Sequence, residues 1–177
     1  GEDPVLGSVL VGPLVEGIQQ NVMAIAKHYI NNNQEHDRSG VNEVVDEVTE
    51  MELYGPPFGA AAQRAHGIMC SYNLVNGEHA CENHHTLRTM LKGYYNFSGF
   101  VVSDWGGTHS TGKAIAAGLD IEMPEARYFT EANIEAALAA KEITEADLDD
   151  SCARVLGGWY RLPVAKRYPC GGKVCIA

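Results

Sequence analysis

Residues 99–106, GFVVSDWG, combine a short apolar run with a carboxylate and an indole. An apolar run of this length beside a glycine predicts a buried strand over residues 100–104. Asp104 then lies at the carboxyl end of that strand, and Trp105 follows it directly. Similar runs predict three further strands, over residues 22–26, 68–72 and 119–123.

Helical patterns separate these strands. We expect helices over residues 5–20, 45–54, 86–92 and 111–117, and a helix over residues 58–65 that the pair Pro56-Pro57 starts. One further helix is capped by Thr130, and a last helix starts at Thr144 with Asp147 and ends before Pro163. This alternation indicates a parallel sheet, either in an open doubly wound fold or in part of an eight-stranded barrel. No G-x-G-x-x-G motif or phosphate loop follows a strand. Polar residues gather where the strands end, which favours part of an incomplete (β/α)8 TIM-type barrel.

Composition excludes several classes of protein. The 177 residues carry 13 Lys and Arg against 23 Asp and Glu, and no basic cluster suited to binding nucleic acid is present. The apolar runs are too short to cross a membrane, which takes roughly 20 residues in a helix. With 45% hydrophobic and 20% charged residues, the composition is that of a globular domain. Because the chain starts at Gly1 without Met, we interpret it as a segment of a longer protein.

Two pairs of neighbouring residues are candidates for chemistry. A carboxylate beside an aromatic ring, as in Asp104-Trp105, suits a sugar site, since the sugar packs on the indole while the carboxylate meets the anomeric carbon. The alternatives are a helix-capping Asp and a core Trp. Lys27 and His28 end another predicted strand, and both reach one pocket only where the strand gives way to loop. A surface Lys beside a His in ordinary contacts is the alternative.

Other polar and sulfur-containing residues give weaker signals. Met69 and Tyr72, in the predicted strand over residues 68–72, are most simply core residues. The polar run over residues 31–38 is interpreted as a solvated loop, with binding of sugar hydroxyls as the alternative. No pair of His residues is spaced by one helical turn, so we expect no metal site and no cofactor.

The cysteines and one short motif bear on the cellular compartment. Two pairs are candidates for disulfides, with free thiols as the alternative: Cys70 with Cys81 across the turn Asn76-Gly77, and Cys170 with Cys175. Cys152 is expected to be a buried free thiol, because it lies at the apolar spacing of the last helix. Asn96-Phe97-Ser98 matches the N-glycosylation motif. Together these features favour a secreted protein.

Six segments in this order resemble glycoside hydrolase family 3, most closely its β-glucosidase branch. They are Glu2-Asp3-Pro4; Lys27-His28-Tyr29 with Asn32-Asn33-Gln34-Glu35; Glu52-Leu53-Tyr54; Met69-Cys70-Ser71-Tyr72-Asn73 with Asn76-Gly77; Gly99-Phe100-Val101-Val102-Ser103-Asp104-Trp105-Gly106; and Ala117-Gly118-Leu119-Asp120-Ile121-Glu122-Met123-Pro124.

The resemblance implies a retaining glycoside hydrolase that removes non-reducing-end β-D-glucosyl residues from a β-glucoside or an oligosaccharide. Asp104 matches the catalytic nucleophile of the family. The positions that match substrate-binding residues are Lys27, His28, Met69, Tyr72 and Trp105.

The resemblance also implies parts that lie outside this chain. The general acid/base Glu of this branch belongs to a second domain, so residues 1–163 form a partial barrel domain and residues 164–177 a linker towards that domain. The first barrel strands would precede Gly1. We therefore expect the isolated segment to be poorly stable and inactive. Three local carboxylates do not match the acid/base motif: Glu35, Asp120 and Glu122.

Other functions remain as alternatives. Trp105 stands where the β-xylosidase branch typically has Cys, which favours a β-glucosidase and leaves a β-xylosidase as the minor alternative. Residues 27–31 do not match the β-N-acetylglucosaminidase motif. A carbohydrate-binding protein without catalysis and a purely structural α/β domain are the remaining alternatives.

Overall fold

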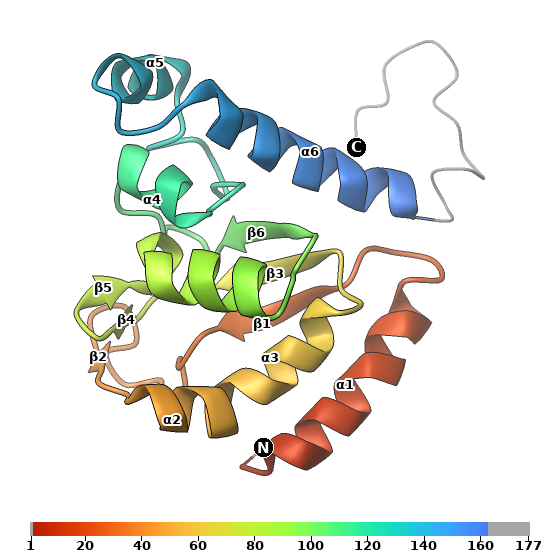
Figure 1. Ribbon diagram of the computed structural model, residues 1–177. Helices are drawn as coiled ribbons and strands as arrows, with labels where there is room; N and C mark the ends of the chain where they lie inside the picture. Colours follow the sequence, from red (N-terminus) through yellow and green to blue (C-terminus); the bar gives the residue numbers. More distant parts are fainter. Residues whose placement is uncertain (1, 163–177) are drawn as a thin grey trace.

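The computed structural model describes residues 2–162. Its centre is an open, parallel three-stranded sheet in the order β1 (Ile25–Tyr29), β3 (Gly67–Cys70), β6 (Phe100–Ser103) (Figure 1). Gly99 enters β6 at a point where any side chain would collide with the carbonyl oxygen of His66. Residues 2–162 thus form an α/β segment whose parallel sheet is open at both edge strands, β1 and β6.

Two of the four predicted strands differ from the structure. The strand expected over residues 22–26 lies three residues later, because Val22 is exposed in the connection and the fully buried Tyr29 anchors β1 to the core. The predicted strand over residues 119–123 is reduced to a single parallel bridge between Ile121 and Val102. The chain there is held to β6 mainly by backbone and side-chain hydrogen bonds.

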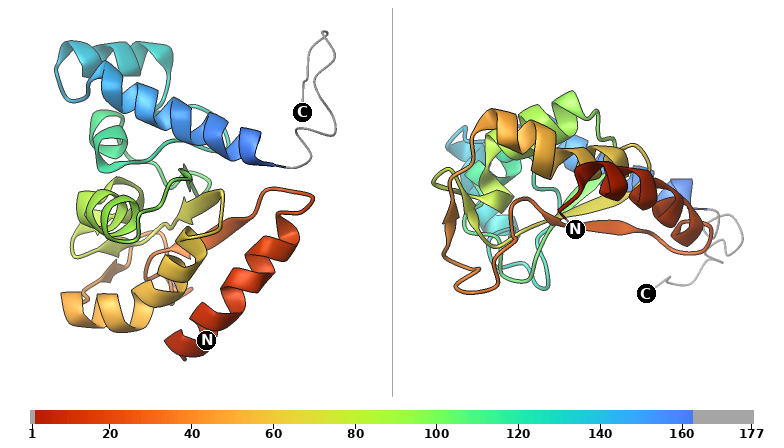
Figure 2. Two further views of the ribbon diagram at one scale, coloured as in Figure 1. Left: turned by 45° about the vertical axis from the view of Figure 1, so that its right-hand side comes forward. Right: turned by 90° about the horizontal axis from the view of Figure 1, so that it is seen from below.

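Helices lie beside the sheet and beyond both of its edge strands, β1 and β6 (Figure 2). In chain order the helical segments are α1 (Pro4–Ile18), α2 (Glu47–Thr49), η1 (Glu50–Tyr54), α3 (Gly55–Ala62), η2 (Ala80–Glu82), η3 (His85–Tyr94), α4 (Gly112–Ala117), α5 (Glu131–Ala139) and α6 (Glu145–Arg161). Thr130 and Thr144 cap α5 and α6 as predicted, the second with the reciprocal Asp147 contact. α3 begins at Gly55 with Pro56 and Pro57 in its first turn, as the proline pair predicted. No helix among residues 2–162 has the length and apolar character needed to cross a membrane.

The two faces of the sheet pack differently. One face packs against the helices through fully buried side chains, among them Tyr29, Ile68, Leu87, Leu91, Val101 and Leu119. The other face carries Met69, Phe100 and Val102, and the ring of Phe100 packs against Gly158 of α6. Because side chains alternate along β6, Asp104 continues the row of Phe100 and Val102.

A small second sheet joins β2 (Asn42–Glu43), β4 (Leu74–Val75) and β5 (Glu78–His79). Its hairpin turns at Asn76-Gly77, both with positive φ (50° and 91°). This turn brings Cys70 and Cys81 together in a disulfide. The disulfide alternative is therefore confirmed for this pair, and the free-thiol alternative is wrong. The other candidate pair, Cys170 with Cys175, lies outside the described residues, as does the predicted linker.

The prediction that Cys152 is buried is wrong. Cys152 is a free, exposed thiol on α6. Cys152 does lie on the apolar face of α6. On this face it lines an open groove of about 490 Å³, together with residues such as Phe129 and Leu156. The spacing identified the apolar face of the helix, whereas no described residue covers it.

Candidate active site

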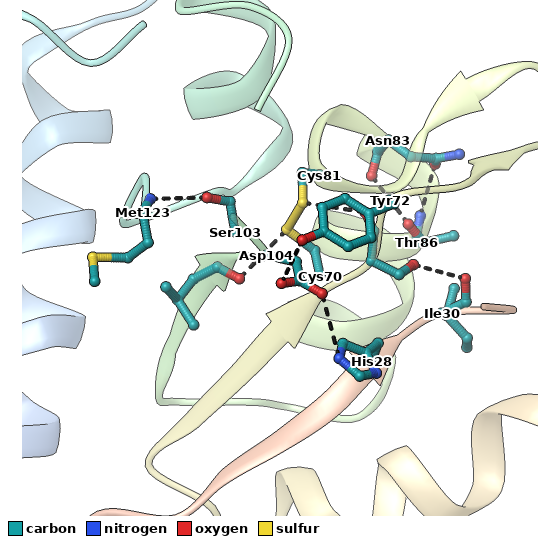
Figure 3. The surroundings of a disulfide bond; sticks show 12 residues. His28, Ile30, Cys70, Tyr72, Cys81, Asn83, Thr86, Ser103, Asp104 and Met123 are labelled. Atoms are coloured by element: carbon teal, nitrogen blue, oxygen red, sulfur yellow. Dashed lines mark hydrogen bonds and ion pairs between the residues drawn. A yellow bond between two sulfur atoms is a disulfide. The ribbon is translucent and has the colours of Figure 1, made fainter. Parts of the chain in front are cut away.

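Three neighbouring strands bring His28, Tyr72 and Asp104 together (Figure 3). Asp104 follows β6, and its backbone N–H donates to the carbonyl oxygen of Cys70 at 3.2 Å. The Tyr72 hydroxyl donates to Asp104 Oδ1 at 2.9 Å, and His28 Nε2 lies 3.3 Å from Asp104 Oδ2. The Asp104 side chain is 13% exposed. Each carboxylate oxygen therefore faces one polar group from a neighbouring strand.

A β-bulge in β1 explains how His28 reaches Asp104. Ala26 pairs with Ile68 and Tyr29 pairs with Cys70, so β1 advances three residues while β3 advances two. Ala26 and Tyr29 both pack towards the helical face of the sheet. The extra residue gives Lys27 and His28 directions that a regular strand would not allow. The expectation that both lie where the strand gives way to loop is wrong, because they lie within β1.

The proton states of the trio follow from burial and from the carboxylate. Burial lowers the pKa of His28, and Asp104 opposes that shift only in part. Burial raises the pKa of Tyr72, and its hydrogen bond to Asp104 raises it further. The Tyr72 phenol therefore stays protonated and donates a hydrogen bond to the carboxylate of Asp104. When the pH is above the pKa of His28, its imidazole is neutral and lies beside Oδ2 of Asp104.

The other predicted site residues make no ion pair and no side-chain hydrogen bond with Asp104. Lys27 is exposed, and no carboxylate among residues 2–162 pairs with it. Trp105 is half exposed, at 50%, so the interpretation as a core Trp is wrong. Met69 is buried against Phe100 and Val102 and lies in the core, its simplest interpretation.

The helix-capping interpretation of Asp104 is also wrong. The next helix, α4, begins at Gly112, and the segment after Asp104 is a turn in which Gly107 N–H donates to the Asp104 carbonyl oxygen at 2.7 Å. The carboxylate of Asp104 is thus directed to Tyr72 and His28 and not to a helix end.

Arg38 lies at the site although no sequence pattern singled it out. Its guanidinium lies 5.2 Å from the ring centroid of Tyr72, and it pairs with Glu35 at 3.0 Å. The polar run over residues 31–38 is exposed from residue 33 onwards, as predicted for a solvated loop, and it folds back so that Arg38 lies beside Tyr72. The density of polar residues in this run was the available signal, but nothing in the sequence fixed the path of the loop.

Nearby carboxylates are engaged in structural contacts. The side chain of Asp120 is fully buried, and its Oδ1 lies 2.8 Å from Lys92 Nζ. Glu122 accepts backbone N–H groups from Tyr128 and Phe129 at 2.8 and 2.7 Å. Both carboxylates stabilise the connections around β6, whereas Asp104 faces side-chain donors at the carboxyl ends of the strands.

Comparisons with known proteins agree with this geometry. Residues 1–157 match the model of the glycosyl hydrolase family 3 N-terminal domain. The chain is 39% identical over 177 residues to β-glucosidase cel3A of Pyricularia oryzae, covering 96% of this chain and 24% of that protein. It is 40% identical over 158 residues to thermostable β-glucosidase B of Acetivibrio thermocellus, covering 88% of this chain and 21% of that protein.

Solved structures give the same result. β-Glucosidase D2-BGL from Chaetomella raphigera superposes with a TM-score of 0.89 at 39% identity, covering 96% of this chain and 24% of that one. DesR, a β-glucosidase from Streptomyces venezuelae in complex with D-glucose, superposes with a TM-score of 0.86 at 34% identity, with the same coverage. The chain thus spans about a quarter of the length of these relatives. It belongs to glycosyl hydrolase family 3, and residues 1–157 are an N-terminal-domain segment of that family.

Proposed function

We propose that the protein containing this chain is a retaining β-glucosidase and that Asp104 is its nucleophile. The observation that carries the proposal is the carboxylate of Asp104 at the end of β6, in contact with the Tyr72 hydroxyl and His28. The hydrogen bond from Tyr72 holds the carboxylate in a fixed orientation, which a nucleophile needs in order to attack one carbon atom of the substrate. The β-glucosidases among the relatives support the reaction class.

In the proposed reaction Asp104 forms a bond to the anomeric carbon while the bond from that carbon to the leaving oxygen breaks. The leaving oxygen takes a proton from the general acid, which we place in a second domain after this segment. The resulting glycosyl ester is hydrolysed by water, which gives its proton to the same acid/base group. A retaining arrangement requires the two carboxyl groups to lie about 5–5.5 Å apart.

Substrate binding follows from the residues around the trio. Lys27, whose ammonium pairs with no carboxylate among residues 2–162, would donate to hydroxyls of the non-reducing-end glucosyl unit. His28 would accept a hydrogen bond from one of these hydroxyls through the ring nitrogen that does not face Asp104. Half-exposed Trp105 would pack against the sugar, and Tyr72 would hold the nucleophile. Met69, buried below, would shape the base of the site. The D-glucose bound by DesR supports this substrate class.

We further propose that residues 1–163 are the C-terminal part of a (β/α)8 barrel and that residues 164–177 lead to the second domain. β1 is an edge strand of the described sheet, and an apolar groove of about 490 Å³ runs between α1, β1 and α3. α1 also exposes a row of large apolar side chains, including Val5, Leu6, Val9, Leu10 and Leu14. Barrel strands from elsewhere in the protein would cover these surfaces, so the segment alone would be unstable and inactive.

We propose a secreted location on the basis of the disulfide between Cys70 and Cys81, because such bonds persist in oxidising compartments.

The test is the replacement of Asp104 by Asn in the full-length protein, with turnover of an aryl β-glucoside as the readout. We expect at least a roughly thousandfold loss of kcat, because the covalent step loses its nucleophile. The matched control is Asp149→Asn, an exposed carboxylate of α6, which keeps wild-type turnover. Wild-type turnover in Asp104→Asn would remove Asp104 from this role. Binding of glucose by a wild-type protein that hydrolyses no glycoside would favour the carbohydrate-binding alternative.

A further inference from the structure

Asn96 lies on an exposed turn between η3 and β6. Its φ of 51° is in the left-handed region that Asn tolerates better than most residues. Its N–H donates to the carbonyl oxygen of Gly93 at 3.1 Å, while its side-chain amide makes no hydrogen bond with residues 2–162. The carboxamide is therefore presented to solvent on a structured turn.

The two following residues complete an acceptor motif and fix the turn. Phe97 is 1% exposed, and its N–H donates to the carbonyl oxygen of Leu91 at 3.1 Å. Ser98 is exposed, and its hydroxyl accepts from Arg161 Nη1 at 2.9 Å. Burial of the central Phe97 thus fixes the turn beneath an open Asn96, and a bulky group on Asn96 would extend into solvent.

The turn lies at the end of the sheet opposite Asp104. Asn96 precedes β6 and Asp104 follows it, so at least the four residues of β6 separate them, or about 13 Å at 3.3 Å per residue. A glycan at Asn96 would therefore leave the site of Asp104 open.

The disulfide supplies the independent indication of the compartment. Cys70 and Cys81 are both almost completely inaccessible to solvent, and their bond closes the chain around the β4–β5 hairpin. Such a bond forms in the oxidising secretory lumen, where Asn-X-Ser/Thr motifs are modified. The core and the turn therefore point to the same cellular route.

We propose that Asn96 carries an N-linked glycan. In the transfer, Asn96 Nδ2 attacks the anomeric carbon of an oligosaccharide held on a lipid pyrophosphate. The carbon–nitrogen bond forms as the bond to the pyrophosphate oxygen breaks. The lipid pyrophosphate leaves with the bonding electron pair, and one amide proton is released.

The test uses the full-length protein, produced from its own reading frame in a eukaryotic cell and digested to peptides. We expect the peptide that contains Asn96 to carry a glycan, which peptide N-glycosidase removes while converting Asn96 to Asp. Ser98→Ala destroys the motif without changing the Asn96 side chain, so the glycan should be lost. Ser98→Thr keeps the motif and its hydroxyl, so the glycan should remain.

The turnover of an aryl β-glucoside should stay within about twofold of wild type in both variants, because the turn lies away from Asp104. An unmodified Asn96 in the exported wild-type protein would overturn the proposal, and so would a wild-type protein that is retained in the cytosol. Persistence of the modification in Ser98→Ala would also overturn it.

Discussion

Replacing Lys92 by Met should weaken the structure that supports β6. Lys92 lies in η3, and its Nζ is 2.8 and 3.0 Å from the two carboxylate oxygens of Asp120. The side chains of the pair are only 4% and 0% exposed. Asp120 also accepts from the backbone N–H of Val101 in β6 and from the Ser151 hydroxyl of α6, at 2.7 and 2.9 Å. One carboxylate thus connects η3, β6 and α6.

The magnitude follows from the charge that the substitution leaves behind. Lys92→Met keeps most of the apolar stem but strands the buried Asp120 carboxylate without its cation. Breaking such a pair from one side costs about 3–5 kcal/mol, a factor of roughly 10²–10⁴ in the opening equilibrium. We expect this loss in the opening free energy of β6 peptides, measured by hydrogen exchange and mass spectrometry on the full-length protein.

The loss should depend on pH. Burial already raises the pKa of Asp120 and lowers that of Lys92 to about 8. Without Lys92 the pKa of Asp120 rises further, so the folded state binds more protons than the unfolded state and its stability falls as pH rises. The deficit should therefore be larger near about pH 8 than near about pH 5. A deficit below about 1 kcal/mol that does not change with pH would show that Lys92 does not stabilise the Asp120 carboxylate. The control Glu16→Gln, which breaks an exposed pair with Arg64, should cost less than about 1 kcal/mol.

Three further results are expected. Tyr72→Phe removes the donor to Asp104 and should lower kcat/KM for an aryl β-glucoside by about 10- to 100-fold, because hydrogen bonds to charged groups contribute about 1.5–3 kcal/mol. Replacing both Cys70 and Cys81 by Ala opens the disulfide-closed loop and should lower the free energy of unfolding by about 2–5 kcal/mol in urea titrations. Burial, together with the nearby charge of Arg161, lowers the pKa of His66, so stability should fall as pH drops below about 6.5, and His66→Gln should flatten that acid limb in thermal denaturation.

Matched controls separate these effects from general damage. Tyr94→Phe, on a largely exposed ring, should leave kcat/KM unchanged, and an equal loss in both Tyr variants would contradict the role of Tyr72. Cys152→Ala removes an exposed free thiol and should leave stability within about 0.5 kcal/mol of wild type. An unaltered acid limb in His66→Gln would show that other groups set the pH dependence.

Local patterns in the sequence predicted the centre of the fold. The apolar run before Asp104 corresponds to β6, and the threonine caps of α5 and α6 lie where their hydrogen-bonding side chains indicated. These features depend on a few adjacent residues and on the local period of apolar side chains. Asp104 follows its strand for the same reason, and this position could therefore be read from the chain.

Features that depend on distant packing could not be predicted. The bulge that directs His28 arises from the register between β1 and β3, which no local period records. Arg38 reaches Tyr72 through the path of a loop. The exposure of Cys152 depends on what covers α6, although the spacing had identified the correct face. The strand predicted over residues 119–123 is a further example of a feature that local patterns could not predict. Isolated hydrogen bonds to β6 replace most of the expected strand pairing there.

Trapping of the covalent intermediate shows which carboxylate attacks the sugar. The full-length protein is incubated with a 2-deoxy-2-fluoro-β-glucoside that has a good leaving group, and its peptides are mapped by mass spectrometry. The fluorine slows both the formation and the hydrolysis of the glycosyl ester, and the good leaving group restores the rate of formation, so the ester accumulates. We expect one fluoroglucosyl group, attached to Asp104. A label on another carboxylate, or no label on an enzyme that hydrolyses ordinary β-glucosides, would contradict it.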